Sequence, residues 1–330
     1  MVRNVAIIGC GAIAGGYDEA QDGKTSLSHM GAYKRDARFR VIACVEPDEA
    51  RGQAFADYWG VANWYPSIES LLNAGDVIDM VSVCTPDEEH VSTLQSVLSL
   101  QPMAVLAEKP LGINSAAACK VVDAYQEAGT LLAVNYMRRC SPVLQGLARQ
   151  IQSGHYGDLQ NAVVRYTKGL FHNGSHLLDL MLWFFGELRV CFTRSRSIID
   201  FSENDPTIDA VMETHDSTPV YLCGLDSRHY TAFELDLSFS DGRVVATDMI
   251  TRITRYETDK SATFPSQRLL LQSDTETCNV QMWIPLMIDN VVRSVEGDVS
   301  LCSDGGNALK VLELCEIIRD SWIDTAQVEK

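Results

Sequence analysis

A glycine-rich turn follows an apolar run near the beginning of this sequence. Residues 5–14 read VAIIGCGAIA, a pattern typical of a buried parallel strand that ends in G-x-G-x-x-A. Gly9 and Gly11 let the backbone turn sharply and approach a pyrophosphate that a side chain would block. The free N–H groups of the next helix then face this anion. We therefore expect a dinucleotide-binding unit in which Gly9, Gly11, Ala12 and Ile13 contact the cofactor.

The composition is that of a globular protein and narrows the range of partners. The chain has 330 residues, enough for two domains, with 46% hydrophobic and 22% charged residues. Its formal net charge is −17, which argues against nucleic acid and anionic membranes as partners, because both require a basic surface. A small anionic cofactor stays compatible with this charge, since local N–H groups and one lysine can set the field within a cleft.

Two regions differ in their hydrophobic pattern. Over residues 1–135 short apolar strands alternate with helical segments, which predicts an α/β, doubly wound parallel sheet of the Rossmann type. Over residues 136–330 the strands are long and alternating, which predicts an α+β domain with a large, mostly antiparallel open sheet. A C-terminal helix at about 306–322 can pack back toward the first domain. The expected strands are 4–9, 40–45, 79–84, 104–107 and 131–135, then 160–167, 188–199, 220–223, 230–239, 243–255 and 268–283.

The ten cysteines do not form a recognisable disulfide or metal pattern. Most lie in apolar runs, where a cysteine behaves as a small hydrophobic residue, and no C-x-x-C pair occurs. The sequence has no leader pattern, and the apolar segment 177–185 is too short to span a bilayer. These features predict a reduced, cytoplasmic protein.

Glu46 ends the second expected strand and is a candidate for cofactor selection. There its carboxylate would accept hydrogen bonds from ribose hydroxyls and repel a 2′-phosphate, which favours NAD over NADP. The glutamate lies 32 residues after Ala14, later than the usual spacing, because the turn-rich insert 15–23 delays the first helix to about 28–36. Alternatively, Glu46 is a surface acid at the start of a Glu-Pro turn.

The end of the next strand offers further cofactor contacts. Thr85 and Pro86 stand where this strand gives way to a helix, and a threonine hydroxyl at this point can touch the cofactor. His90 follows in the helix. Two interpretations of His90 stay open, a cofactor ligand and a helix residue whose ring is used within the protein.

Five short motifs, together with the features above, resemble the Gfo/Idh/MocA family of NAD(P)-dependent oxidoreductases. The motifs are GCGAIA at 9–14, VEP at 45–47, CTP at 84–86, EKP at 108–110 and G-x-H-x-x-D at 174–179. The resemblance implies hydride transfer to or from a sugar, cyclitol or nucleotide sugar, and a sheet face that forms a homodimer or homotetramer. Two alternatives within the family stay open: redox-neutral glycoside cleavage or elimination with bound NAD, and a non-catalytic NAD- or sugar-sensing regulator.

Lys109 is the first candidate for catalysis. It ends a strand at the edge of the sheet where substrate and nicotinamide would meet, and it can hydrogen-bond the reacting oxygen. Partial burial would lower its pKa toward a useful range. The resemblance assigns Lys109 this role, places Glu108 and Lys109 at the cofactor, and suggests a cis Lys109–Pro110 bond. A solvated lysine before a turn is the alternative.

The second candidate site is the segment 171–179. A helix would align His172, His176 and Asp179 on one face. The resemblance makes His176 the acid–base residue, but many members carry aspartate where this chain has His172. We expect His172 and Asn173 to bind substrate, as well as Lys168, which would hold an anionic group. A core role for His176 is the alternative, and a metal site is disfavoured because no further ligand cluster accompanies the histidines.

Overall fold

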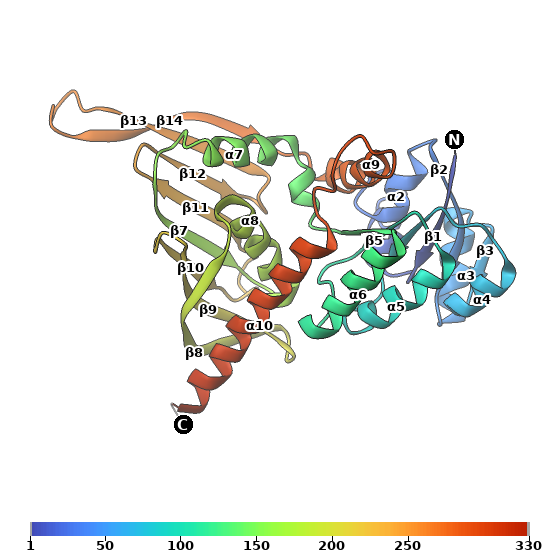
Figure 1. Ribbon diagram of the computed structural model, residues 1–330. Helices are drawn as coiled ribbons and strands as arrows, with labels where there is room; N and C mark the ends of the chain where they lie inside the picture. Colours follow the sequence, from blue (N-terminus) through green and yellow to red (C-terminus); the bar gives the residue numbers. More distant parts are fainter. Residues whose placement is uncertain (1, 329–330) are drawn as a thin grey trace. The chain divides into compact units, whose positions relative to one another are not determined.

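The computed structural model describes residues 2–328, without the side chains of residues 195–196 and 324–328. The chain divides into two compact units (Figure 1). The first contains the residues up to 140 together with 280–310, and the second contains residues 141–279 together with those from 311 on. The sequence suggested one boundary after residue 135 and did not indicate that 280–310 belongs to the first unit.

The first unit is built on a parallel sheet of six strands in the order β3-β2-β1-β4-β5-β6. This is the predicted Rossmann sheet, and the five expected strands are present with ends shifted by at most one residue. The short edge strand β3 was not expected. The strands are β1 (Arg3–Ile8), β2 (Phe39–Val45), β3 (Asn63–Tyr65), β4 (Met80–Val83), β5 (Ala104–Ala107) and β6 (Leu131–Val134).

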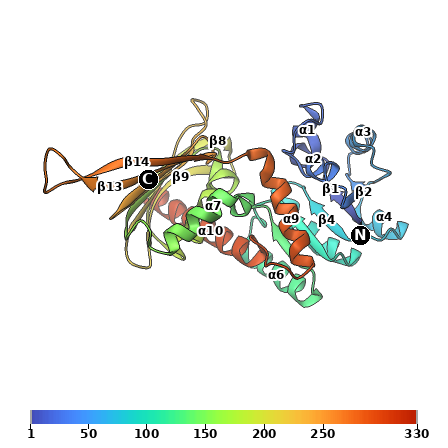
Figure 2. The ribbon, with the colours of Figure 1, turned by 90° about the horizontal axis from the view of Figure 1, so that it is seen from above.

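Helices cover both faces of this sheet (Figures 1 and 2). Helices α5 and α6 pack together on one face, and α2 and α9 pack together on the other. A side-chain oxygen caps α2, α3, α4 and α6 at Ser28, Asp48, Ser67 and Asn114 respectively, which fixes where each begins. The helices are α2 (His29–Lys34), α3 (Glu49–Trp59), α4 (Ile68–Ala74), α5 (His90–Val97), α6 (Ser115–Ala128) and α9 (Trp283–Val295).

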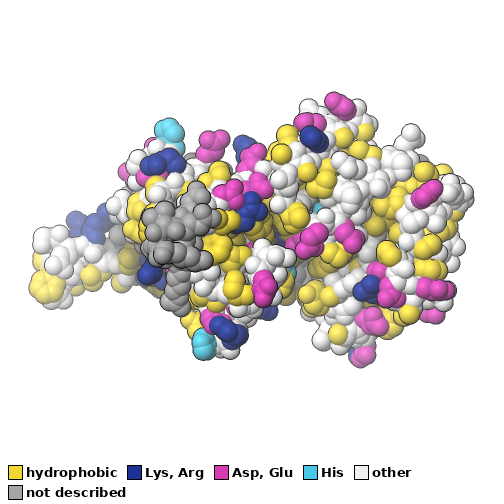
Figure 3. Space-filling model, turned by 90° about the horizontal axis from the view of Figure 1, so that it is seen from below, with side chains coloured by type: hydrophobic (Ala, Val, Ile, Leu, Met, Phe, Trp, Pro, Cys, Tyr) yellow, Lys and Arg dark blue, Asp and Glu magenta, His cyan; other side chains and the backbone are white. Residues whose placement is uncertain are grey.

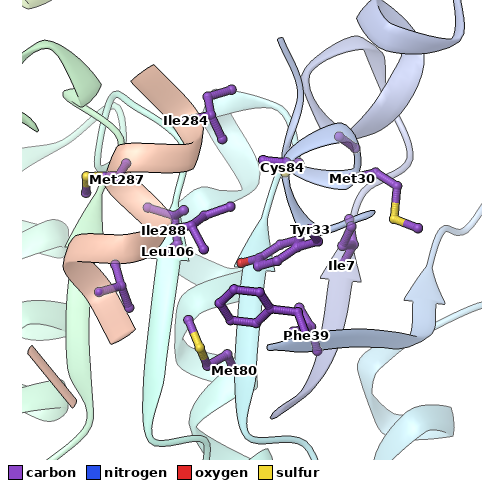
Figure 4. Close-up of a cluster of buried hydrophobic side chains, with 14 of the residues drawn as sticks. Ile7, Met30, Tyr33, Phe39, Met80, Cys84, Leu106, Ile284, Met287 and Ile288 are labelled. Atoms are coloured by element: carbon purple, nitrogen blue, oxygen red, sulfur yellow. The ribbon is translucent and has the colours of Figure 1, made fainter. Parts of the chain in front are cut away.

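Helix α9 closes the core of the first unit, although it lies far along the sequence. Its apolar side chains Ile284, Met287 and Ile288 lie beside Leu106 and the aromatic ring of Tyr33 (Figure 4). The buried positions of α9 recur with helical spacing. The expectation of a strand over 268–283 was therefore wrong for its last residues, because the strand ends at Thr277 and the helix begins at Trp283.

The second unit holds the predicted large sheet. Eight strands follow the order β14-β13-β12-β11-β7-β10-β9-β8, and all neighbours are antiparallel except β7 and β10. The strands are β7 (Leu159–Tyr166), β8 (Leu188–Ser202), β9 (Asp205–Thr214), β10 (Pro219–Gly224), β11 (Phe233–Phe239), β12 (Gly242–Thr247), β13 (Arg252–Lys260) and β14 (Arg268–Thr277). The helices are α7 (Pro142–Gln152), α8 (Ser175–Phe185) and α10 (Gly305–Val328), of which α10 begins in the first unit.

One expectation for this sheet was wrong, and one strand was missed. The expected single strand over 243–255 is a hairpin of β12 and β13, which turns through Asp248, Met249 and Ile250, all with positive φ. Strand β9 was not expected at all.

Strand β14 lies at one edge of the sheet and is exposed along its whole length. The β13–β14 hairpin exposes Leu269, Leu270 and Leu271, and hydrophobic side chains are visible at its end in Figure 3.

The expectation of fully reduced cysteines is also corrected. Cys140 and Cys302, both in the first unit, form a disulfide with their Cα atoms 6.1 Å apart. The two residues are separated by 162 positions in the sequence, so no local pattern could reveal the pair. The segment after Cys302 runs beside β6, where the Val134 N–H donates to the Ser303 carbonyl over 3.2 Å. No helix among residues 2–328 is both long and apolar enough to cross a membrane.

The insert after the glycine turn is held by one buried carboxylate. Asp18 accepts hydrogen bonds from the backbone N–H groups of Leu27 and Ser28, at 2.9 and 2.8 Å, and from the hydroxyls of Thr25 and Ser28. Burial raises the pKa of Asp18, but these hydrogen bonds outweigh it and hold the pKa below its usual range. The insert and the residues that follow it are thus ordered as far as Ser28, the cap of α2.

Replacing Asp18 with Asn should destabilise the protein. The amide would set an N–H donor against the donors that now reach the carboxylate, at a cost of about 1–3 kcal/mol at pH 7. Because the folded pKa is depressed, the stabilisation by Asp18 is present above the unfolded pKa of ~3.9 and is lost as the pH falls through the folded value. Urea unfolding at pH 7 and near pH 3 measures this. Asp22→Asn, at an exposed site, is the control, and an equal effect of both variants would contradict the argument.

Candidate functional site

The glycine turn has the open backbone that a pyrophosphate requires. Gly9 has φ +87°, and a Cβ atom there would lie 2.7 Å from the Cys84 carbonyl oxygen, so only glycine fits between β1 and β4. At Gly11 a Cβ atom would meet nothing within 4 Å. The backbone at Gly11 is therefore accessible to a ligand, and Ala12 and Ile13 follow in the helical turn Ala12–Gly16.

Glu46 lies beside this turn, at the end of β2. Its Oε2 accepts a hydrogen bond from the Cys10 N–H over 3.1 Å, and its Oε1 accepts one from the Asp48 N–H over 3.2 Å. The residue is only 6% exposed, which does not fit the alternative of a surface acid. Arg51, which sequence reasoning missed, donates to Oε1 over 3.1 Å. The Glu46 carboxylate is thus fixed next to the glycine turn, and the Arg51 guanidinium lies beside it.

Thr85 and His90 differ in whether their polar side-chain atoms have hydrogen-bond partners within the protein. The Thr85 hydroxyl is buried and has no hydrogen-bond partner among the described residues. His90 uses both ring nitrogens within the protein, Nδ1 on the Pro110 carbonyl at 2.5 Å and Nε2 on the Thr85 carbonyl at 2.9 Å. This geometry fits the structural interpretation of His90. Pro86 is exposed between them.

The Glu108–Lys109–Pro110 turn follows β5 at the same edge of the sheet. The Lys109–Pro110 bond is cis, as the resemblance suggested. Lys109 is partly exposed, whereas the Glu108 carboxylate is buried and contacts His29 and Asn135. Neither His29 nor Asn135 was expected near the site. The strand ends carrying Gly9, Glu46, Thr85 and Lys109 all belong to one parallel sheet, so they lie along one edge of it.

The second unit carries the candidate acid–base histidine. His176 and Asp179 are both buried, three residues apart on α8 and hence on one helix face. The His176 ring packs edge-on against Phe233, with ring centroids 6.0 Å apart. His172 does not belong to α8, contrary to expectation. It lies in a π-helical turn over Gly169–Gly174, which precedes α8 and also contains Asn173. The His172 ring instead stacks on Phe201 of β8, with centroids 4.1 Å apart.

Two aspartates from the tip of the β8–β9 hairpin hold this turn. Asp205 accepts hydrogen bonds from the N–H groups of Phe171 and His172, each over 2.8 Å. Asp200 accepts one from the N–H of Lys168 over 3.1 Å, at a residue with φ +64°. Lys168 therefore has a strained backbone that the hairpin keeps in place, a feature that clusters at functional sites. Sequence reasoning missed both aspartates, because the strand expected over 188–199 ended before Asp200 and β9 was not expected.

Within the described part of the chain, no group of three or more His, Cys, Asp or Glu side chains is arranged to hold a metal ion.

Comparisons with known proteins agree with the dinucleotide-binding unit that the glycine turn predicted. The sequence model of an oxidoreductase family with an NAD-binding Rossmann fold matches this part of the chain. The match with this model, that of the Gfo/Idh/MocA family, spans residues 3–136. This confirms the predicted class of the chain, an oxidoreductase with a nicotinamide cofactor.

The relatives are similar at modest sequence identity. An inositol 2-dehydrogenase from Corynebacterium glutamicum is 24% identical over 262 residues, which cover 74% of this chain and 70% of the relative. The WlbA dehydrogenase from Bordetella pertussis, solved with NADH and UDP-GlcNAcA, is 18% identical with a TM-score of 0.79, covering 98% of this chain and 96% of its own. The UDP-N-acetylglucosamine 3-dehydrogenase GnnA from Acidithiobacillus ferrooxidans is 16% identical with a TM-score of 0.73, covering 99% of both chains. The likeness in fold to these solved structures thus covers both units of this chain.

Gly11→Ala should separate cofactor binding from folding. A methyl group at Gly11 has open space, so the melting temperature should stay near that of the parent, while NADH affinity should fall by about tenfold or more because the methyl occupies the pyrophosphate's place. Gly9→Ala should instead destabilise the protein by about 1–3 kcal/mol, since its Cβ meets the Cys84 carbonyl. Thermal melts and NADH fluorescence titrations measure both, with Gly146→Ala on α7 as the control. Unchanged NADH affinity in Gly11→Ala would contradict this assignment.

Proposed function

We propose that this protein transfers a hydride between C4 of NAD and a carbinol or carbonyl carbon of a sugar-like substrate. The observation that carries the proposal is the position of Lys109, at the end of β5 on the sheet edge that also holds the open glycine turn. The ligands of similar proteins and the family of residues 3–136 support the proposal. Bound NAD would supply the hydride acceptor.

Each catalytic residue has a separate role in the proposal. In the oxidation direction, His176 takes the proton of the substrate hydroxyl, and Lys109 donates a hydrogen bond to the oxygen as negative charge develops on it. The burial of His176 beside Phe233 fixes its ring orientation. Orientation of the substrate carbon toward the nicotinamide contributes much of the rate enhancement. The pairing of an acid–base histidine with a lysine favours an enzyme over a non-catalytic sensor.

The proposed substrate is a sugar, a cyclitol or a nucleotide sugar. The inositol dehydrogenase and the nucleotide-sugar dehydrogenases among the similar proteins support this range. In the second unit Lys168, His172 and Asn173 would bind it, with Lys168 on an anionic group such as a carboxylate or phosphate. The structure records no acidic partner for the Lys168 ammonium among the described residues, which supports a role toward an external anion.

Glu46 would make the protein prefer NAD to NADP. Its buried carboxylate beside the glycine turn would accept hydrogen bonds from the adenosine ribose and repel a 2′-phosphate. Arg51 opposes this preference, because its side chain is 56% exposed and its guanidinium can turn from Glu46 toward a phosphate. We therefore propose an NAD enzyme with residual use of NADP.

We also propose a homodimer or homotetramer. The exposed leucines of β14, at an edge of the large sheet, support self-association, since an apolar edge strand left in water promotes aggregation.

Replacing Lys109 or His176 with Ala should abolish most turnover and leave NAD binding in place. We expect kcat to fall by about 100-fold or more in each variant, the scale of losing a general acid or base, and the dissociation constant of NADH to change little. Turnover is followed by NADH absorbance on a panel of sugars, cyclitols, uronates and nucleotide sugars. Lys24→Ala, on the exposed insert, is the control. Product formation without free NADH would indicate redox-neutral chemistry, and an equal loss of NADH affinity in both variants would refute the assigned roles.

The ratio of kcat/KM for NAD and NADP should respond in opposite directions to two neighbouring substitutions. Glu46→Ala should raise relative use of NADP, because it removes the negative charge and leaves Arg51 available. Arg51→Ala should lower it, because Glu46 then faces the 2′-phosphate without a compensating cation. Parallel assays with both cofactors measure the ratio, and a parent protein that prefers NADP would contradict the role of Glu46.

A further inference from the structure

A chain of buried polar side chains runs through the first unit and ends at Glu108. The His29 Nε2 lies 2.9 Å from a Glu108 carboxylate oxygen, and the Asn135 amide donates to the same oxygen over 2.6 Å. The other ring nitrogen of His29 lies 3.0 Å from the Ser82 hydroxyl, which also contacts the Tyr33 hydroxyl at 2.9 Å. All five residues are at least nine-tenths buried, and they come from α2, β4 and the segments after β5 and β6.

The partners of Glu108 decide its charge. A carboxylate removed from water is stable as an anion only with donors or a cation beside it. Burial raises the pKa of Glu108, but His29 and Asn135 outweigh burial and lower it. Burial lowers the pKa of His29, but Cys84 and Glu108 outweigh burial and raise it to about 10. Both directions favour an imidazolium–carboxylate pair. Cys84, Tyr33 and Glu108 are the titratable groups around His29.

The pair is coupled by the backbone to the candidate catalytic lysine. Glu108 directly precedes Lys109, and Pro110 directly follows it. The Pro110 carbonyl contacts the His90 ring, so the turn is held on its other side as well. Lys109 is therefore the middle residue of this turn. Glu108 on one side of it contacts the buried His29, and Pro110 on the other side contacts the buried His90.

We propose that His29 is a positioning residue, a buried cation that keeps the Glu108 carboxylate ionised and in one place, so that the turn presents Lys109 in a single orientation. This inference rests on the proposed function, in which Lys109 is catalytic. It explains why the core of the first unit contains an ion pair where hydrophobic packing would give similar or better stability.

Steady-state kinetics of four variants test the proposal. His29→Gln and Glu108→Gln should each lower kcat by about 10- to 100-fold, the cost of a small displacement of a reacting group, with KM for NAD within about threefold of the parent. The double variant should be no slower than the slower single variant, because the two residues act as a unit. Tyr33→Phe, which removes a neutral group at the far end of the same chain, should keep kcat within about twofold.

A purely structural role predicts a different pattern. It would lower NADH affinity and melting temperature together with kcat, and Tyr33→Phe would then follow the same relation between melting temperature and kcat. That pattern, or wild-type kcat in His29→Gln, overturns the proposal.

A spectroscopic measurement on the parent protein needs no variant to fold. In protein labelled with ¹⁵N-histidine, the ring of His29, identified by its through-space contacts with Tyr33, should show two protonated nitrogens at pH 7. A neutral His29 overturns the proposal. If no substrate of the panel is oxidised while NADH still binds, the proposed function fails separately, and the His29 spectrum still decides whether the pair with Glu108 is ionic.

Discussion

The close approach of Gly9 to the Cys84 carbonyl is the constraint on which the first unit depends. Strands β1 and β4 meet there with no room for a side chain, so the turns that leave β1 and β4 stay side by side. This proximity brings the glycine turn next to Thr85, whose buried hydroxyl has no partner among the described residues. It also aligns the neighbouring strand ends, which carry Glu46 and Lys109. The edge of the sheet at which we propose that the cofactor binds is thus a consequence of backbone packing, which fixes the positions of its side chains.

Residues at strand ends could be predicted from the sequence because local patterns define them. An apolar run followed by Gly9, Glu46, Thr85 or Lys109 indicates a buried strand and the residue that emerges from it, without reference to distant parts of the chain. The order of such motifs carried the family resemblance, which the comparison over residues 3–136 confirms. His176 was found in the same way, from a short motif at the start of a helix. The roles of these residues in binding and catalysis stay predictions.

The features that were missed depend on partners far apart in the sequence. Asp200 and Asp205 hold the Lys168 turn from another strand pair, and His29 reaches Glu108 across 79 positions. The disulfide of Cys140 and Cys302 and the packing of α9 in the first unit were missed for the same reason, because each joins parts of the chain that are far apart in the sequence. The β12–β13 turn was missed for a local reason, because Asp248 marks the bend without any glycine, proline or asparagine beside it.

The placement of α9 also has a consequence for how the protein is made. Ile7 and Phe39 emerge early from the ribosome, but the helix that completes their core ends only at Val295. The whole of residues 141–279 is therefore synthesised while the nucleotide-binding half still lacks part of its hydrophobic covering. Domains usually fold as units in the order of synthesis. Here the first unit can complete its core only after residues 141–279 have been synthesised. Nascent chains halted before residue 283 would therefore carry an incomplete, aggregation-prone interior.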